Sequence, residues 1–306
     1  MNCNLCNWKC NVDRENKLGV CKCGYLPKLA LASVHMWEEP CISGTNGSGT
    51  VFFTGCNLKC DFCQNYKISQ EGFGKEISVE RLSEIFIELQ EKNVHNINLV
   101  SPTPYVNHII EAIKTAKQNG LKIPIVYNTN SYETVETIKL LDGVIDIYLP
   151  DLKYATDDIA LKYSKVPNYF ETSTKAISEM VNQVGDPEFD ENGMMKKGVI
   201  IRHLVLPGHL TETKKVIKWV NDNLGDKVYL SIMAQYFPTY KCKDGQCLNR
   251  KLNQKEYDII LNMIKEVSNG YIQELSNCEE EYVPEFDLRG IWFFLFKSDI
   301  IILLNI

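Results

Sequence analysis

Short β-rich runs alternate with segments of helical periodicity from residue 50 onward, and this alternation limits the possible folds more than any other feature. A strand that is followed each time by a helix is typical of a parallel sheet covered by helices. The sequence therefore predicts an α/β fold, a partial (β/α)6 TIM-type barrel. The six strand candidates are residues 50–54, 97–100, 123–127, 144–149, 199–206 and 228–233.

Apolar residues recur every three or four positions between these strands, as on one face of an amphipathic helix. Four such faces are predicted, in residues 79–89, 106–116, 216–224 and 257–267, the second of them ending before Gly120. Residues 185–197 contain Pro187 and Gly193 and are predicted to form a surface loop.

Composition and charge are those of an ordinary globular protein of 306 residues, with 44% hydrophobic and 24% charged residues. The net charge of -6 argues against a nucleic-acid partner bound through a basic surface. No secretory signal pattern stands at the first residues, so a reducing cytoplasmic location is expected. The apolar residues 291–306 are shorter than the ~20 residues of a membrane span, and we predict a packed element or irregular tail and no membrane partner.

Residues 1–45 differ from the rest because they contain six cysteines and show little apolar periodicity. No clear strand or helix is predicted there. We expect a small Cys-rich metal-binding lobe at 1–45, the barrel at 46–276 and a C-terminal extension at 277–306.

Three cysteines, Cys56, Cys60 and Cys63, follow the first predicted strand directly. Three thiolates at this spacing can hold three irons of a [4Fe-4S] cluster and leave the fourth iron open. A structural zinc is the alternative, but zinc normally takes a fourth tight ligand. We therefore expect a catalytic cluster at the carboxyl end of the strand, where barrels collect reactive groups.

A second set, Cys3, Cys6, Cys10 and Cys21, is expected to bind another metal, with Cys23 and Cys41 as substitute ligands. Thiolate ligands suit zinc, iron and an iron–sulfur cluster alike, so the metal stays open. Cys242 and Cys247 are predicted to be surface thiols.

The triplet spacing, with Phe62 before the last cysteine, resembles the radical S-adenosylmethionine (SAM) enzymes. Residues 39–44, Glu-Pro-Cys-Ile-Ser-Gly, make the chain similar to PflX-type homologues of pyruvate formate-lyase activating enzyme. This resemblance implies that SAM binds the open iron. One electron, from a donor such as flavodoxin or ferredoxin, would then cleave SAM to a 5'-deoxyadenosyl radical that takes hydrogen from a substrate.

Polar residues after later strands are the candidates for SAM contacts. The resemblance implies such roles for Ser101, Asn128, Asp151, Lys153, Arg202 and Gln235, with His203 and His209 as weaker candidates. Ser101 stands where the family often has Gly-Gly-Glu, while Asp151 and Lys153 resemble the Asp-x-Lys motif of the activating enzymes. The alternatives are a strand exit at Ser101, a turn at Asn128, a surface ion pair of Asp151 with Lys153, and an internal salt bridge of Arg202.

Three functions remain open. The first is an activase that takes hydrogen from a glycine of a partner enzyme. The second is radical modification of another peptide or of a small molecule. The third is a non-catalytic electron-transfer or metal-binding protein. Cysteines that precede the triplet depart from activating enzymes, whose extra cluster cysteines usually follow it, so the substrate is open.

Overall fold

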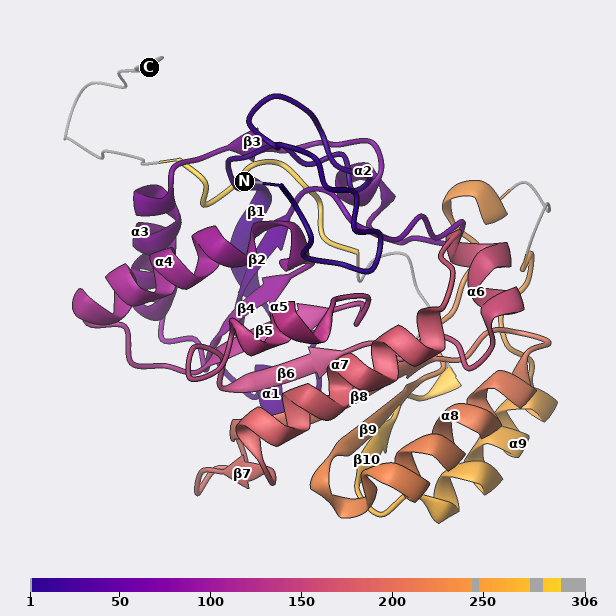
Figure 1. The fold of residues 1–306 in the computed structure, drawn as a ribbon. Helices are drawn as coiled ribbons and strands as arrows, with labels where there is room; N and C mark the ends of the chain where they lie inside the picture. The colour runs from indigo at the N-terminus through magenta and orange to yellow at the C-terminus, as the bar shows by residue number, and fades with distance from the viewer. Residues whose placement is uncertain (1, 244–247, 276–282, 293–306) are drawn as a thin grey trace.

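A largely parallel sheet forms the centre of the molecule (Figure 1). The structure is a computed structural model that describes residues 2–243, 248–275 and 283–292. Seven strands run parallel, in the order β10-β9-β8-β6-β5-β4-β2. They are β2 (Ser48–Phe53), β4 (Ile97–Val100), β5 (Ile125–Thr129), β6 (Ile147–Pro150), β8 (Met195–Leu204), β9 (Tyr229–Met233) and β10 (Gly270–Ile272).

The predicted fold class is confirmed, and each of the six predicted strands overlaps one of these seven. The sequence did not predict β10, which has only three residues and no helical or alternating signal of its own.

The expectation that residues 1–45 contain no strand was wrong. β1 (Lys28–His35) pairs antiparallel with β2 along its length, and β3 (Lys75–Glu76) pairs with β1. β1 was missed because irregular, cysteine-rich chain precedes it directly and obscures its strand pattern. The C-terminal residues 288–291 lie along β1, where Leu288 N donates to Ala30 O at 3.0 Å and Ala32 N to Arg289 O at 2.9 Å.

All four predicted helical faces lie on helices, and α7 was missed. The longer helices are α3 (Val79–Gln90), α4 (Val106–Gln118), α7 (Tyr169–Val184), α8 (Leu210–Asn223) and α9 (Gln254–Met263). The shorter ones are α1 (Pro40–Ser43), α2 (Tyr66–Ser69), α5 (Val135–Lys139) and α6 (Asp157–Ser164). Single 3-10 turns are η1 (Thr103–Tyr105), η2 (Gly225–Lys227), η3 (Tyr240–Cys242) and η4 (Ile264–Glu266).

Residues 185–197 are not a simple loop, because β7 (Glu188–Phe189) pairs antiparallel with the start of β8. Asp190 closes this hairpin by accepting hydrogen bonds from the backbone of Asn192 and Met194. A short polar hairpin carries the same Pro and Gly signals as a loop, which explains the error.

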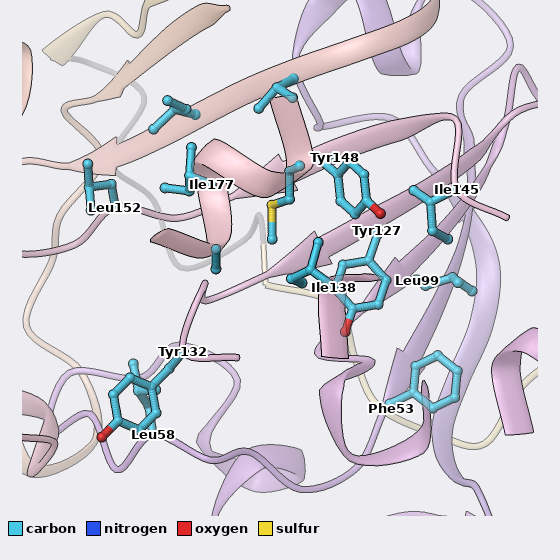
Figure 2. Close-up of a cluster of buried hydrophobic side chains, with 14 of the residues drawn as sticks. Phe53, Leu58, Leu99, Tyr127, Tyr132, Ile138, Ile145, Tyr148, Leu152 and Ile177 are labelled. Carbon is cyan, nitrogen blue, oxygen red and sulfur yellow. The ribbon is translucent and has the colours of Figure 1, made fainter. Parts of the chain in front are cut away.

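Buried apolar side chains form three separate clusters, one of which consists of Ala30, Leu31, Phe52, Ile68 and Val100. On the outer face, Tyr127 and Tyr148 meet helix residues such as Ile138 and Ile177 (Figure 2). On the opposite face, Cys41 and Ile42 of α1 pack against Val126, Ile147, Leu149, Met195 and Ile200. α1 therefore packs against the face of the sheet that the outer helices leave uncovered.

No helix in the described ranges is long and apolar enough to cross a membrane. Of the apolar segment 291–306, Ile291 is fully buried, and residues 293–306 lie outside the described ranges.

Candidate functional site

One cavity of about 340 Å³ opens where the parallel strands end. Because the carboxyl ends of parallel strands meet at one edge, the loops that follow them contribute side chains to the same space. All nine residues predicted for the cluster and for SAM line this cavity: Cys56, Cys60, Cys63, Ser101, Asn128, Asp151, Lys153, Arg202 and Gln235. The structure thus brings the predicted site together, while the role of each residue stays a prediction.

The triplet loop begins at Gly55, whose backbone has φ +93°. A Cβ at this position would lie 2.1 Å from Cys23 Sγ, so only glycine fits between the loop and the N-terminal lobe. Gly55 N also donates to Ile68 O at 3.0 Å, which holds the loop against α2. Gln70 Nε2 donates to Cys60 O at 2.8 Å. The cysteines are therefore held on a fixed backbone.

Burial raises the pKa of each of Cys56, Cys60 and Cys63 to about 11. Polar partners face the sulfurs. Ser164 Oγ lies 2.9 Å from Cys60 Sγ, Ser69 Oγ lies 3.2 Å from Cys63 Sγ, and Asn130 Nδ2 donates to Cys56 Sγ at 3.4 Å. Buried thiols of raised pKa stay protonated at neutral pH, and a metal that binds them displaces these protons.

Phe62 lies between the rings of Tyr163 and Tyr236, with centroids 6.4 Å and 5.8 Å away. The ring is buried and packs against both tyrosines beside the triplet loop.

A network of charged side chains forms the opposite wall. Lys153 Nζ lies 2.6 Å from Asp151 Oδ2, and Arg202 Nε lies 2.9 Å from Asp151 Oδ1. Although burial acts against it, Arg202 and then Lys153 hold the pKa of Asp151 below its ordinary value. Asp151 is therefore ionised at neutral pH and fixes both cations. Because these side chains are mostly buried, a purely superficial ion pair is excluded for Asp151 and Lys153.

Arg202 makes the internal salt bridge that was the alternative to a SAM contact. Its other partners are Glu38 Oε2, 3.3 Å from Nη1, and the side-chain oxygen of Asn128. A SAM carboxylate would have to join or replace one of these acceptors.

Sequence reasoning missed Glu38, Glu39 and Asn98. Glu38 lines the cavity beside Arg202. Asn98 is fully buried, and buried Glu39 Oε2 has no hydrogen-bond partner within the described ranges. Two adjacent acidic residues before a proline, close to an apolar strand, were the available signal, since such residues are seldom buried without a reason.

Ser101 adopts φ +59°, which turns the chain out of β4 toward the cavity. Gln235 also faces the cavity, with Nε2 3.8 Å from Met233 Sδ.

The two histidines lie elsewhere. His203 is buried, with ring nitrogens 2.7 Å from Leu152 O and 3.0 Å from Thr213 Oγ1, and burial lowers its pKa to about 4. His209 lies 3.0 Å from Tyr163 OH. Neither histidine lines the cavity.

The loop after β5 is held by Glu133. Its Oε1 accepts hydrogen bonds from Thr103, at 2.6 Å, and from Thr129, while its Oε2 has no partner among the residues that the structure describes. Burial raises the pKa of Glu133. This carboxyl group ties the end of β5, which carries Asn128, and the following loop with Asn130 to the loop that follows β4.

The N-terminal cysteines lie against the triplet loop. Trp8 Nε1 donates to Asn57 O at 2.7 Å, and Cys23 Sγ lies 3.5 Å from Thr54 O. Within the described ranges, no three His, Cys, Asp or Glu side chains are close enough to share a single metal ion. A second metal at Cys3, Cys6, Cys10 and Cys21 therefore stays a prediction.

Two expectations about other cysteines were wrong. Cys41 belongs to α1 and packs with Ile147 and Ile200, far along the strands from the N-terminal lobe, so it is no substitute ligand. Cys242 is fully buried and disulfide-bonded, not a surface thiol, whereas Cys247 lies outside the described ranges.

A partial barrel with three buried or half-buried cysteines after β2 defines a class of iron–sulfur enzymes, and the comparisons identify the family. The Radical SAM superfamily model matches residues 50–220, more than half of the chain. The chain belongs to this superfamily.

Two relatives come from Methanocaldococcus jannaschii. The uncharacterized protein MJ0674 is 34% identical over 283 residues, which cover 89% of this chain and 77% of that protein. The putative glycyl-radical enzyme activating enzyme MJ1227 is 33% identical over 106 residues, 33% of this chain and 42% of that protein.

A solved structure with a similar arrangement supports the fold. HydG, a maturase of the [FeFe]-hydrogenase, matches 74% of this chain and 52% of its own with a TM-score of 0.51 and 16% identity. Streptococcus suis SuiB bound to S-adenosylmethionine matches 72% of this chain and 48% of its own, with a TM-score of 0.48 and 14% identity. The chain thus spans about half the length of these two structures.

Proposed function

We propose that this protein is a radical SAM enzyme that reductively cleaves S-adenosylmethionine at a [4Fe-4S] cluster and abstracts hydrogen from a protein or peptide substrate. The observation that carries the proposal is the shared cavity, where three buried thiols face the polar residues expected to hold SAM. With cluster and SAM bound, the site would supply a 5'-deoxyadenosyl radical.

The residues present fit this cofactor pair. Three thiols of one loop offer three ligands and leave one iron of a cubane free. Ser101, Asn128 and Gln235 offer hydrogen-bond partners for a polar nucleoside, and Lys153 and Arg202 offer cations for a carboxylate. Asp151 holds both cations in position through its two oxygens.

The first candidate substrate is a glycine residue of a glycyl-radical enzyme. With this substrate, the protein would be activase-like. The partial similarity to the putative activating enzyme MJ1227 supports it. Modification of a small molecule or of a peptide precursor is the second candidate. Both need an electron donor such as flavodoxin or ferredoxin, and we place the reaction in the cytoplasm. A second metal at the N-terminal cysteines completes the proposal.

Electron paramagnetic resonance (EPR) tests the central part. The reduced, anaerobically reconstituted chain should give a cluster signal that changes when SAM is added. The variant with Cys56, Cys60 and Cys63 all replaced by Ala should lack that SAM-dependent change. A wild-type EPR signal that does not change when SAM is added would favour the non-catalytic electron-transfer alternative.

Mixing the reduced protein and SAM with a glycyl-radical enzyme from the same source tests the activase. A glycine-centred radical on the partner is the expected result. SAM cleavage with no partner radical would move the proposal to another peptide or a small molecule.

A further inference from the structure

Cysteines of the N-terminal lobe gather around Gly19 and the turn that follows Cys3. An added Cβ on Gly19 would lie 3.2 Å from Cys21 Sγ and 3.7 Å from Cys10 Sγ, so both sulfurs approach the same glycine. Cys10 Sγ lies 4.0 Å from the carbonyl oxygen of Cys3. Cys6 belongs to the same turn, where Lys9 N donates to Cys6 O at 3.0 Å and Asn11 N donates to Cys3 O at 3.0 Å.

The fifth cysteine of the lobe lies beside Cys21 and at the root of the triplet loop. Cys23 Sγ lies 3.5 Å from Cys21 O, 3.5 Å from Thr54 O, and against Gly55. Its side chain therefore lies between the lobe and the barrel. We take Cys3, Cys6, Cys10 and Cys21 as the ligand set, with Cys23 as the substitute for Cys21.

The spacing of these sulfurs distinguishes between metals. Four sulfurs bound to one zinc at about 2.3 Å must lie roughly 4 Å from one another. No three candidate ligands within the described part of the chain are grouped for a single ion. A cubane spreads its ligands more widely, because each cysteine binds a different iron.

Arg14 supplies a cation to the same interior. Its Nη2 donates to Cys21 Sγ at 3.4 Å and its Nη1 to Pro104 O, while its buried Nε has no hydrogen-bond partner in the part of the chain that the structure describes. A [4Fe-4S] cluster with four thiolates is anionic, and N–H donors toward its sulfurs are a usual means of stabilising it. A buried guanidinium with a free N–H suits such a group.

We propose that Cys3, Cys6, Cys10 and Cys21 bind a second cluster of the [4Fe-4S] type, with Arg14 as its cationic neighbour. The proposal names the metal centre left open in the proposed function and so builds on it. This cluster would lie next to the triplet loop, because Trp8 and Cys23 of the lobe contact Asn57 and Thr54 directly.

Metal analysis of the Cys56→Ala, Cys60→Ala, Cys63→Ala triple variant tests it. After anaerobic reconstitution with ferrous iron and sulfide, we expect about four iron and four sulfide per chain to remain, with a Mössbauer spectrum of a cubane. Adding Cys6→Ala to this variant should remove that iron. Adding Cys41→Ala instead should leave it unchanged, because Cys41 lies apart from the lobe.

One zinc per chain, no retained iron, or equal loss with Cys6→Ala and Cys41→Ala would overturn the proposal. Because the triple variant could fold poorly, Cys10→Ser in the otherwise unchanged chain is the second measurement. It should halve the iron content from about eight to about four, and unchanged iron would overturn the proposal as well. A wild-type chain with two clusters that does not cleave SAM would instead refute only the proposed function.

Discussion

The two cysteine sets share their chemistry but differ in what supports them. The triplet follows β2, so the sheet fixes where its loop begins and which cavity it enters. The N-terminal set lies on residues 2–27, where the structure describes only isolated bridges such as Cys6 with Glu133. Its position depends on this bridge and on side-chain contacts with the barrel, such as that of Trp8 with Asn57. The comparison teaches that a regular strand makes the position of a site predictable. An irregular segment supplies candidate ligands, but their position in the fold cannot be predicted from the sequence.

The largest expected effect is that of Asp151→Asn on the barrel side. Asp151 holds two mostly buried cations, and removal of one partner of a buried ion pair costs about 3 to 5 kcal/mol. Denaturant unfolding and SAM binding to the reconstituted protein should both weaken. Lys175→Gln, which removes an exposed partner of Glu171, is the matched control and should cost less than about 1 kcal/mol.

The same variant gives a pH test. The folded pKa of Asp151 is lowered, so its stabilising contribution is fully present above the unfolded pKa near ~3.9 and is lost as pH falls through the folded value. Unfolding free energy of the wild type should thus drop below about pH 4 more steeply than that of Asp151→Asn. Equal slopes would contradict an ionised Asp151 in this network.

Gly55→Ala tests the contact between the triplet loop and the N-terminal cysteine lobe. The new Cβ would meet Cys23 Sγ at 2.1 Å and the residue would keep φ +93°, for a combined cost of about 2 to 5 kcal/mol. The amount of iron bound by the triplet should decrease together with the stability of the variant. Adding Cys23→Ala should recover the steric part and leave the backbone strain. No recovery would mean that lobe and loop do not meet as described.

Glu133→Gln tests the loop that lies between both sets. Burial raises the pKa of Glu133, so the neutral form is favoured in the folded protein. The resulting stabilisation is fully present below the unfolded pKa and is lost as pH rises through the folded pKa. Gln imitates the neutral form. At pH 5 the variant should lie within about 1 to 2 kcal/mol of the wild type, and by pH 8 the difference should move in favour of Gln. Exposed Glu136→Gln should show no such trend.

Trp8→Phe should have the smallest effect. It removes the bond from Nε1 to Asn57 O but keeps a ring beside Tyr132, at a cost of about 1 kcal/mol. Chemical denaturation of the reconstituted protein measures it. A loss of several kcal/mol would show that the lobe is bound to the barrel more tightly than these contacts indicate.

Most of the barrel could be predicted because its strands and helices repeat known periods. β2 and the loop with Cys56, Cys60 and Cys63 illustrate this, since an apolar strand that runs into cysteines defines both element and site. The cavity also gathers Asp151 and Arg202, although they are 51 positions apart, because both follow or occupy parallel strands. The alternation of strands and helices and the order of the strands were sufficient to predict that these two residues share the cavity.

What could not be predicted depends on contacts between distant segments. Glu38 reaches Arg202 across 164 positions, and no local period reports such a pair. β1 packs against α3 but pairs antiparallel with β2, so it falls outside the βα rhythm. Cys41 and Cys21 look alike in the sequence, and only the packing of α1 beneath the sheet separates them.

The central claim is that the triplet holds a cluster that cleaves SAM, and formation of 5'-deoxyadenosine measures it most directly. The protein is reconstituted without oxygen, reduced with dithionite and given SAM. We predict 5'-deoxyadenosine and methionine from the wild-type chain and none from Cys60→Ala, whose thiol lies beside Ser164 at the cavity wall. Absence of cleavage by a wild-type chain with a full iron complement, or equal cleavage by Cys60→Ala, would contradict the account.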